Sequence, residues 1–558
     1  MPDVNHSPPP VLSGAPSYPS ILGSGSRPVR DTGPVPLAFE RLGSVFLLAT
    51  TIALAVLWSM GMGNDQALFE YYAHRMRDGA LLYHDIWDNK QPGIFFWYVA
   101  SDWAFGPGWQ GLRQSLALWY GASAVAAAVL CGLVKPQSRA WWLAPVFTVG
   151  LALVRIDAER PAQVEALVDL PLMLLVMLLL IEPGSRIGRS LRWVGVGALT
   201  GVVASLKLVL APIPAAIIVV VLAWRIHRRE IGVAAIVQAF AWMLAGFALV
   251  IVPIVAWFWS RGIFAEFLWT MFVYPGMALK EVPTQRIAML LGAFKWLAVT
   301  CIPVALAALL AVREAVREPA SRTSLLGFIC ITWVGVGIVM IVLQKFSWWN
   351  THMDLIDWPV GMLAALGLAG AVGADARART PLGRSLVLVA ALLAVAGMGL
   401  HLARFGYAAL RGNDWPKPRD ELQALETARQ VVRTAVAPCG TVYAIGDQAG
   451  VERATGLKQA LHTHGLWFGA FLTSQIEQLP GELARVRPDL VYFDADHRRD
   501  FLRRAPATLE ALDVWLQRDY DVMVVDAFGG HWFHRRDARP GDACPSVRPF
   551  KVPGQTAG

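Results

Sequence analysis

Charged residues are scarce in this sequence. Asp, Glu, Lys and Arg make up only 16% of its 558 residues, whereas soluble domains carry about 25%. This low charge, with 55% apolar residues and a mean hydropathy of +0.46, excludes both an ordinary soluble domain and a disordered chain. The sequence also shows no zinc-ligand spacing, no P-loop and no Ser-His-Asp pattern, so it does not contain the usual soluble catalytic motifs.

Long apolar runs are abundant instead. A helix needs about 20 apolar residues to cross a bilayer, and blocks approaching that length recur from residue 42 to residue 403. They lie at 42–62, 112–134, 141–154, 162–181, 193–206, 209–224, 233–259, 288–311, 324–344, 354–373 and 385–403. We therefore predict a polytopic α-helical membrane protein with about eleven spans.

The positions of the basic residues predict the orientation. The formal net charge is +8, and basic residues of membrane proteins concentrate in cytoplasmic loops. If the N-terminus is cytoplasmic, every loop on that side is basic, with clusters at 135–139, 186–192, 225–229, 313–322 and 377–384. An odd number of spans then places the C-terminal segment outside the cytoplasm. The basic charge is explained by membrane topology, and no nucleic-acid partner is expected.

Composition predicts three parts of the chain. Residues 1–40 are rich in Pro, Ser and Gly and are expected to form a disordered cytoplasmic tail. Residues 41–410 form the transmembrane domain. Residues 411–558 contain charges, turns and three β-type runs at 441–445, 490–493 and 522–525, with helical stretches near 419–436, 464–486 and 499–518. This pattern predicts a soluble extracytoplasmic α/β domain.

Cysteine is rare, with five residues in the chain. Cys439 and Cys544 are the only two in the C-terminal segment. An oxidising compartment would allow them to form a disulfide. The sequence does not give the geometry, so a disulfide and two free thiols are both open.

The first outward connection, residues 63–92, combines acids, bases and aromatic residues. Leu68, Tyr71 and Tyr72 have roughly helical spacing, which predicts a short amphipathic helix lying along the membrane surface. Asp65 directly follows the first span. It is either a capping residue of this helix or a reactive carboxylate at the outer rim of the bilayer.

Further acids and bases fall in the other outward connections. These are Asp157, Glu159, Arg160 and Glu165 in the second, Lys207 in the third, and Lys345 and His352 before the tenth predicted span. Carboxylates can deprotonate a hydroxyl, and basic side chains can hold a phosphate. The plain alternatives are a surface ion pair for Glu159 and Arg160, and interfacial positions for Lys207 and His352.

The first loop resembles that of a known superfamily. Its residues are Gly63-Asn64-Asp65, Gly79, Tyr83, Asp85 and Asn89-Lys90-Gln91-Pro92-Gly93. They resemble the first outer loop of the GT-C membrane glycosyltransferases, in the branch with lipid A aminoarabinose transferases and protein O-mannosyltransferases. That loop typically reads Gly-Asp-Glu, an amphipathic helix, then Lys-Pro-Pro. Here Gln66 replaces the second acid and Gln91 replaces the first Pro, so one carboxylate of a metal clamp is absent.

The resemblance covers residues 42–403 and implies roles for the charged residues. Asp65 would activate the acceptor hydroxyl, and Lys90 would lie near the leaving phosphate. Other members of the implied site are the second-loop acids Asp157, Glu159 and Glu165, the phosphate-binding Arg160, Lys207 and Lys345, and the acceptor-pocket residues Tyr83, Asp85, Asp88 and His352.

The implied reaction is an inverting transfer of a sugar from a polyprenyl-phosphate donor to a hydroxyl of a glycan, lipid or protein acceptor. It would occur at the outer face of the bacterial cytoplasmic (inner) membrane, in contact with membrane lipid. These residues require no cofactor, although a divalent cation (Mg, Mn or Ca) is compatible with them. Two alternatives stay open: a lipid or glycan transporter or flippase, and a non-catalytic GT-C-like partner in envelope polymer assembly.

Overall fold

The structure is a computed structural model of the chain. It describes residues 39–58, 63–136, 138–154, 162–282, 286–344, 348–372, 385–394, 426–431, 440–446, 449–465, 471–526 and 529–538, together with the single positions 284, 381, 396, 399 and 403. The predicted tail at 1–40 lies almost wholly outside this set, as does the start of the predicted C-terminal domain.

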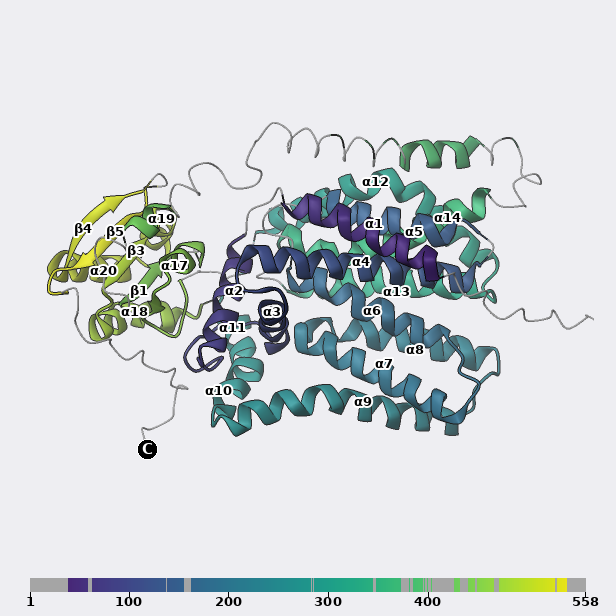
Figure 1. Ribbon diagram of the computed structural model, residues 1–558, viewed down its shortest axis with the longest axis horizontal. Coiled ribbons are helices and arrows are strands. Elements are labelled where there is room, and N and C mark those ends of the chain that lie inside the picture. The colour runs from purple at the N-terminus through teal and green to yellow at the C-terminus, as the bar shows by residue number, and fades with distance from the viewer. Residues whose placement is uncertain are drawn as a thin grey trace, which may run out of the picture. The chain divides into compact units, whose positions relative to one another are not determined.

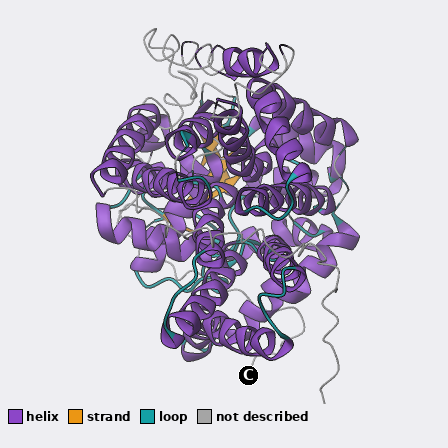
Figure 2. Cartoon of the chain, turned by 90° about the vertical axis from the view of Figure 1, so that its right-hand side faces the viewer, coloured by secondary structure: helices purple, strands orange, loops and turns teal. Residues whose placement is uncertain are grey.

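Long helices make up the N-terminal and central parts of the described chain (Figures 1 and 2). They are α1 (Phe39–Trp58), α4 (Trp109–Val134), α5 (Ala140–Val154), α6 (Val164–Leu180), α7 (Arg186–Leu206), α8 (Pro212–His227), α9 (Val233–Ser260), α12 (Ile287–Arg317), α13 (Arg322–Leu343) and α14 (Asp354–Val372). Helix α1 packs on α4, α7 on α9, and α14 on both α5 and α12. The prediction of a polytopic helical protein is confirmed.

Seven of the described helices are long and apolar enough to cross a membrane. They are Glu40–Trp58, Trp109–Val134, Leu208–His227, Val233–Ser260, Ile287–Arg317, Arg322–Leu343 and Asn350–Ala371. The chain is therefore a multi-pass membrane protein. The other four predicted spans fall on α5, α6, α7 and the apolar helix Ser385–Ala394. They are helical but are not among the seven, so the total of eleven stays a prediction.

Helices α7 and α9 approach each other closely because glycines face each other. A Cβ atom at Gly197 of α7 would overlap the carbonyl oxygen of Met243, and one at Gly246 of α9 would overlap that of Val194. Small residues allow helix backbones to make such contacts in membranes, where van der Waals packing drives association. The structure also confirms a break after α7, where Lys207 and the short turn η1 (Leu208–Leu210) precede Pro212 of α8.

Short helices lie together at one end of the long helices (Figure 1). They are α2 (Asn64–Arg77), α3 (Pro92–Phe105), α10 (Phe264–Leu268), the π-helical turn η2 (Trp269–Val273), α11 (Tyr274–Glu281) and the 3₁₀ turn η3 (Asn350–Met353). Helix α3 was not predicted, because its 14 residues are too few for a span. It begins at Pro92, whose fixed φ and missing N–H suit a first helical position.

The expected membrane-surface position of α2 is wrong in one respect. Tyr71 and Tyr72 are almost fully buried within the protein, and Leu68 is buried as well. The Tyr71 hydroxyl donates to the carbonyl of Leu457 and accepts from the N–H of Gln459. The apolar side of this helix is therefore covered partly by a segment nearly 400 positions later in the chain, which helical periodicity alone does not reveal.

The C-terminal part contains one five-stranded sheet, seen as the only strands in Figure 2 among the described residues. The strands are β1 (Thr441–Ile445), β2 (Lys458–Gln459), β3 (Leu490–Phe493), β4 (Tyr520–Val525) and β5 (His531–Arg535), in the order β2-β1-β3-β5-β4. Strand β1 pairs in parallel with β2 and β3, and β5 pairs antiparallel with β3 and β4.

The three predicted β-runs coincide with β1, β3 and β4, whereas β2 and β5 were missed. Strand β2 has two residues, and β5 reads His-Trp-Phe-His-Arg, a sequence with little β-branched character. The described helices are α17 (Ala449–Thr455), α18 (Thr473–Val486), α19 (Ala495–Arg504) and α20 (Pro506–Asp519). The predicted helix at 499–518 is two helices, because Pro506 ends one and begins the next.

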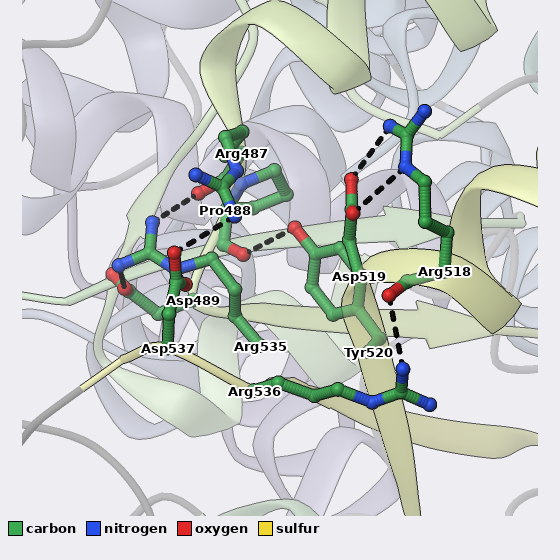
Figure 3. Close-up of polar contacts among 9 residues, drawn as sticks. All are labelled: Arg487, Pro488, Asp489, Arg518, Asp519, Tyr520, Arg535, Arg536 and Asp537. Carbon is green, nitrogen blue, oxygen red and sulfur yellow. Dashed lines mark hydrogen bonds and ion pairs between the residues drawn. The ribbon is translucent and has the colours of Figure 1, made fainter.

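A network of arginines and aspartates ties one end of this sheet together (Figure 3). Asp537 accepts from Arg487 and forms an ion pair with Arg535, at 2.9 Å each, and Arg535 also pairs with Asp489 at 3.1 Å. The Tyr520 hydroxyl donates to the carbonyl of Pro488 at 2.6 Å. These contacts join the start of β3, the start of β4 and the end of β5.

Candidate functional site

Some predicted site residues lie outside the described part of the chain. These are the second-loop residues Asp157, Glu159 and Arg160, the phosphate-binding candidate Lys345, and the disulfide candidates Cys439 and Cys544. Their assignments stay predictions. The described candidates come from four places: helix α2, the loop before α3, the start of α6 with the α7–α8 break, and turn η3.

Asp65 occupies the first turn of α2. The N-cap of this helix is Gly63, with no side-chain capping hydrogen bond, so the capping interpretation of Asp65 is wrong. The Asp65 carboxylate points instead towards Gln163, whose side-chain amide donates to Oδ2 at 2.9 Å. About a third of the side chain remains accessible (38%). The helix N-terminus beside it is a favourable place for a negative charge.

Lys90 lies opposite Asp65. Its ammonium is 3.8 Å from Oδ1 of Asp65 and 3.7 Å from Oδ1 of Asp88. It also lies 4.9 Å from the ring centre of Phe69, which is one turn after Asp65 on the same face of α2. The Asp88 carboxylate accepts the backbone N–H of Lys90 at 2.8 Å. The lysine is therefore held between two carboxylates over an aromatic face.

The loop before Lys90 has a fixed and unusual backbone. Tyr83 adopts φ of 70°, the left-handed region that disfavours side chains with a Cβ. Its hydroxyl donates to the carbonyl of Lys90 at 2.6 Å, and its fully buried ring stacks on Phe258. Asp85 accepts the N–H of Leu81 at 2.7 Å and closes the turn. In this structure Tyr83 and Asp85 contact the loop itself, and their predicted acceptor-pocket role is an open prediction.

A second group of charges lies at the start of α6. The Glu165 carboxylate accepts from the Lys207 ammonium at 2.5 Å and lies 3.6 Å from Nε2 of His352. All three side chains are largely buried. Residues from α6, the α7–α8 break and η3 thus meet at a single carboxylate.

Helix α6 connects the two groups. Gln163, which holds Asp65, is the N-cap of α6 and stands two residues before Glu165. The preceding residue, Ala162, has φ of 61°, and its carbonyl accepts from the Tyr98 hydroxyl of α3. A Cβ at Gly93 would lie 2.5 Å from the backbone oxygen of Ser205, so the start of α3 abuts the end of α7 next to Lys207.

Gln163 was not among the residues predicted for the site. The only sequence signal for it is a polar residue immediately before an apolar helix, which is also the signal of an ordinary helix start. Its contact with Asp65 joins positions 98 residues apart and depends on the tertiary structure.

A neighbouring pair lies on the side of the loop that faces α10. Nδ1 of His84 is 3.1 Å from Oε1 of Glu266, which is buried. Within the described residues, no three His, Cys, Asp or Glu side chains gather in a way that could hold a metal ion. Whether the protein uses a divalent cation is not tested by this observation.

Solved structures with the same fold share little sequence with the chain. ArnT from Cupriavidus metallidurans bound to undecaprenyl phosphate matches with a TM-score of 0.59 at 15% identity, covering 91% of this chain and all (100%) of that one. ArnT in the apo state matches at 0.55 and 16%, covering 88% and 98%. The apo oligosaccharyltransferase of Archaeoglobus fulgidus matches at 0.52 and 11%, covering 86% and 71%.

Comparison by sequence gives no relative. No protein-family model matches the chain, and no curated protein is significantly similar to it. At the identities found, the structural likeness shows the fold and leaves the chemistry to be argued from the residues.

Proposed function

Because the chain has the fold of the GT-C membrane glycosyltransferases, we propose that it transfers a sugar from a polyprenyl-phosphate donor to a hydroxyl group of a glycan, lipid or protein acceptor. The single observation that supports this most directly is the facing pair of Asp65 and Lys90, with their charged groups 3.8 Å apart and both partly accessible. An acid and a base placed together at the rim of a membrane domain suit a reaction with a proton to accept and a phosphate to stabilise.

Asp65 is the proposed general base. Its carboxylate takes the proton of the acceptor hydroxyl as that oxygen attacks the anomeric carbon of the donor sugar. The new carbon–oxygen bond forms as the bond from the anomeric carbon to the phosphate oxygen breaks, so the configuration is inverted. The electron pair of the broken bond stays on the phosphate, and polyprenyl phosphate leaves. A positioned base of this kind contributes about 10²–10⁴ in rate.

Lys90 is the proposed partner of the leaving phosphate. Negative charge develops there in the transition state, and a fixed ammonium stabilises it without reorganisation. Lys207 is a second basic residue of the candidate site, but its ammonium donates to the Glu165 carboxylate at 2.5 Å. In our proposal Lys207 supplies positive charge only when a phosphate competes with Glu165, so it is secondary to Lys90.

The described donor set does not fit a divalent cation between Asp65 and Asp88. The ammonium of Lys90 is within 4 Å of both carboxylates and takes the position that a bridging cation would need. Gln66 stands where a second carboxylate would follow Asp65. We therefore derive no step through a metal ion.

Orientation follows from the basic loops and belongs to the proposal. The N-terminus would be cytoplasmic, and Asp65, Lys90 and the C-terminal α/β region would lie on the outer side of the bacterial inner membrane. A lipid-linked donor suits this location, because a polyprenyl chain can stay in the bilayer while its phosphate reaches the charged groups.

Initial rates of transfer test the proposal. The purified protein is incubated with radiolabelled undecaprenyl-phosphate sugars, pentose and hexose, and an envelope lipid extract as acceptor source. We expect Asp65→Asn to lower kcat about a thousandfold and Lys90→Ala to lower it at least about tenfold. The matched controls are Asp78→Asn, an exposed carboxylate at the end of the same helix, and Lys280→Ala, an exposed base of α11.

The result also separates the alternatives. Folded Asp65→Asn and Lys90→Ala variants that transfer sugar as fast as the parent would contradict the proposed roles. Parent protein that moves labelled lipid across vesicles without breaking the sugar–phosphate bond would identify a flippase. Parent protein with neither activity would favour a non-catalytic partner in envelope assembly.

A further inference from the structure

The C-terminal α/β region contacts the loop that carries the candidate site. Arg453 of α17 donates to both carboxylate oxygens of Glu70 of α2, from Nε to Oε2 and from Nη2 to Oε1, the latter at 2.9 Å. The adjacent Tyr71 hydroxyl bonds to the backbone of Leu457 and Gln459, which flank and form β2. Glu70 and Tyr71 are almost fully buried. Two neighbouring residues of α2 are therefore fixed by the C-terminal region.

Trp87 makes the second contact, on the loop itself. Its backbone N–H donates to the carbonyl of His462 at 2.7 Å, and it forms an isolated parallel bridge with Thr463. Its indole N–H donates to Thr270 of η2 at 3.0 Å, and its ring packs edge-on against Phe471. Segments distant in sequence thus meet at the backbone and the side chain of this one residue, which is only 2% exposed.

These contacts are next to the proposed catalytic groups. Trp87 precedes Asp88 directly and Lys90 by three residues. The Trp87 carbonyl accepts from the Tyr72 hydroxyl at 2.9 Å, which connects this loop back to α2. Residues three or four positions apart lie on the same face of a helix, whereas Asp65 is five and six positions before Glu70 and Tyr71 and lies on a different face. The C-terminal region therefore holds α2 without covering Asp65.

Helix α17, which carries Arg453, is firmly attached to the sheet of the C-terminal region. Glu452, the neighbour of Arg453, is fully buried, accepts the N–H of Ala444 in β1 at 2.9 Å and contacts Nδ1 of His464 at 2.5 Å. Helix α17 is therefore fastened to the sheet beside the residue that holds Glu70. Loops keep a strained backbone such as that of Tyr83 only when the surroundings determine it.

We propose that the C-terminal α/β region is the positioning element of the site: through Arg453, the β2 backbone and the 462–463 segment, it sets the place of Lys90 relative to Asp65. Arg453, Tyr71 and Trp87 are positioning residues in this view and do not touch the substrate. The kinetic consequence rests on the proposed transferase function, whereas the structural consequence does not.

Hydrogen exchange tests the structural consequence. In full-length protein, Arg453→Glu places an acid against Glu70, and Tyr71→Phe removes only the hydroxyl. We expect amides of residues 81–91 to exchange at least about tenfold faster in both variants, because local opening becomes easier. The matched control is Arg498→Glu, which breaks an exposed ion pair with Asp513 on the same region. Unchanged exchange at 81–91 in both test variants overturns the proposal.

Exchanging the two charges of the Glu70–Arg453 pair is a second test by hydrogen exchange. Glu70→Arg combined with Arg453→Glu restores a pair of opposite charges, and it is expected to return exchange at 81–91 to within about twofold of the parent. If Arg453→Glu alone does not fold, Tyr71→Phe, which retains the ring packing, decides the question by itself. Exchange that stays fast in a folded swap variant speaks against a role for this ion pair.

Kinetics separates the inference from the proposed function. If the parent transfers sugar, Tyr71→Phe and Arg453→Glu are expected to lower kcat about tenfold with KM for undecaprenyl-phosphate sugar changed less than about threefold, because the geometry of Lys90 and not donor binding is disturbed. A parent without turnover defeats the proposed function and leaves the exchange test intact. Faster exchange with unchanged kcat limits the region to a stabilising role and overturns the positioning role.

Discussion

The charged cluster of Figure 3 and the charged groups around Asp65 contain the same kinds of residue in different arrangements. In the Figure 3 cluster, Arg518 contacts Asp519 twice, at 2.9 and 2.8 Å, and Arg536 of the cluster also pairs with Asp521, which the figure does not draw, at 2.8 Å. Most of these side chains are exposed. At the site, Lys90 is shared between two carboxylates at 3.7 and 3.8 Å.

The difference lies in how the charges are paired and where. The Arg518–Asp519 and Arg536–Asp521 pairs are short, one-to-one and exposed on the arginine side, so each contributes little to stability. Around Glu165 the groups are more buried and come from α6, the α7–α8 break and η3, so their interaction energies are larger. Charge clustering alone therefore does not identify a site.

Breaking the buried pair of the site is expected to have the largest effect on stability. Lys207→Met leaves Glu165 with a buried charge and one long contact to His352, and it is expected to destabilise the protein by about 3 kcal/mol. The measurement is the thermal unfolding midpoint in detergent. Adding Glu165→Gln to Lys207→Met removes the stranded charge and should recover most of the loss. A drop no larger than that of Arg498→Met would mean that burial does not distinguish the Lys207–Glu165 pair from the more exposed Arg498–Asp513 pair.

Removing the amide that holds Asp65 is expected to have an intermediate effect on activity. Gln163→Ala deletes the 2.9 Å contact to Oδ2, and hydrogen bonds to charged groups contribute about 1.5–3 kcal/mol. We expect kcat to fall at least about tenfold while KM for the undecaprenyl-phosphate donor changes little. Gln344→Ala, at the end of α13, is the matched amide control. A change in KM alone would assign Gln163 to donor binding.

Acid is expected to affect stability through His462, at the contact between the C-terminal region and the loop that carries Lys90. Burial, and then the nearby charge of His84, lower the pKa of His462 to about 3, from about 6.5 in an unfolded chain. The unfolded state therefore binds the proton first as the pH falls below 6.5, so this stabilisation is present at pH 7 and is lost progressively towards pH 3.

The expected loss at pH 5 is on the order of 1 kcal/mol, because the ring is only partly shielded from solvent. Unfolding midpoints measured from pH 7.5 to pH 4.5 check this for the parent and for His462→Gln, in which the slope should be shallower. Identical slopes would show that His462 does not govern the acid response.

The smallest effect is expected in the Figure 3 cluster. Arg536→Ala removes an exposed pair with Asp521 and should change the unfolding free energy by less than about 1 kcal/mol. Transfer activity should be the same as that of the parent. A loss of activity here would mean that the network at the end of the sheet reaches the site, contrary to the distinction drawn above.

Much of the fold could be predicted from local patterns. The apolar blocks predicted the helical membrane class, and the separate blocks at 193–206 and 209–224 match the break after α7. Runs of apolar β-formers located β1 and β3, since both are fully buried. Strand β5 and helix α3 were missed because their sequences carry no strong periodic signal, and they form through pairing and packing with distant segments.

The sequence predicted which residues belong to the candidate site better than it predicted which of them contact one another. Asp65, Lys90, Glu165, Lys207 and His352 were singled out as outer-loop charges, and the structure brings Asp65 to Lys90 and Glu165 to Lys207 and His352. Which charges pair depends on spacing within a few ångströms between segments far apart in the chain. Periodicity and composition do not contain that information.

The sequence by itself determined that this chain is a multi-pass membrane protein, because the length and apolarity of a segment are enough to decide whether it leaves water. Only the tertiary structure decided that Gln163 holds Asp65, that Lys90 is shared between two carboxylates, and that the C-terminal region meets the first loop at Trp87. Those contacts depend on short-range forces between distant residues, which act only after the chain has folded.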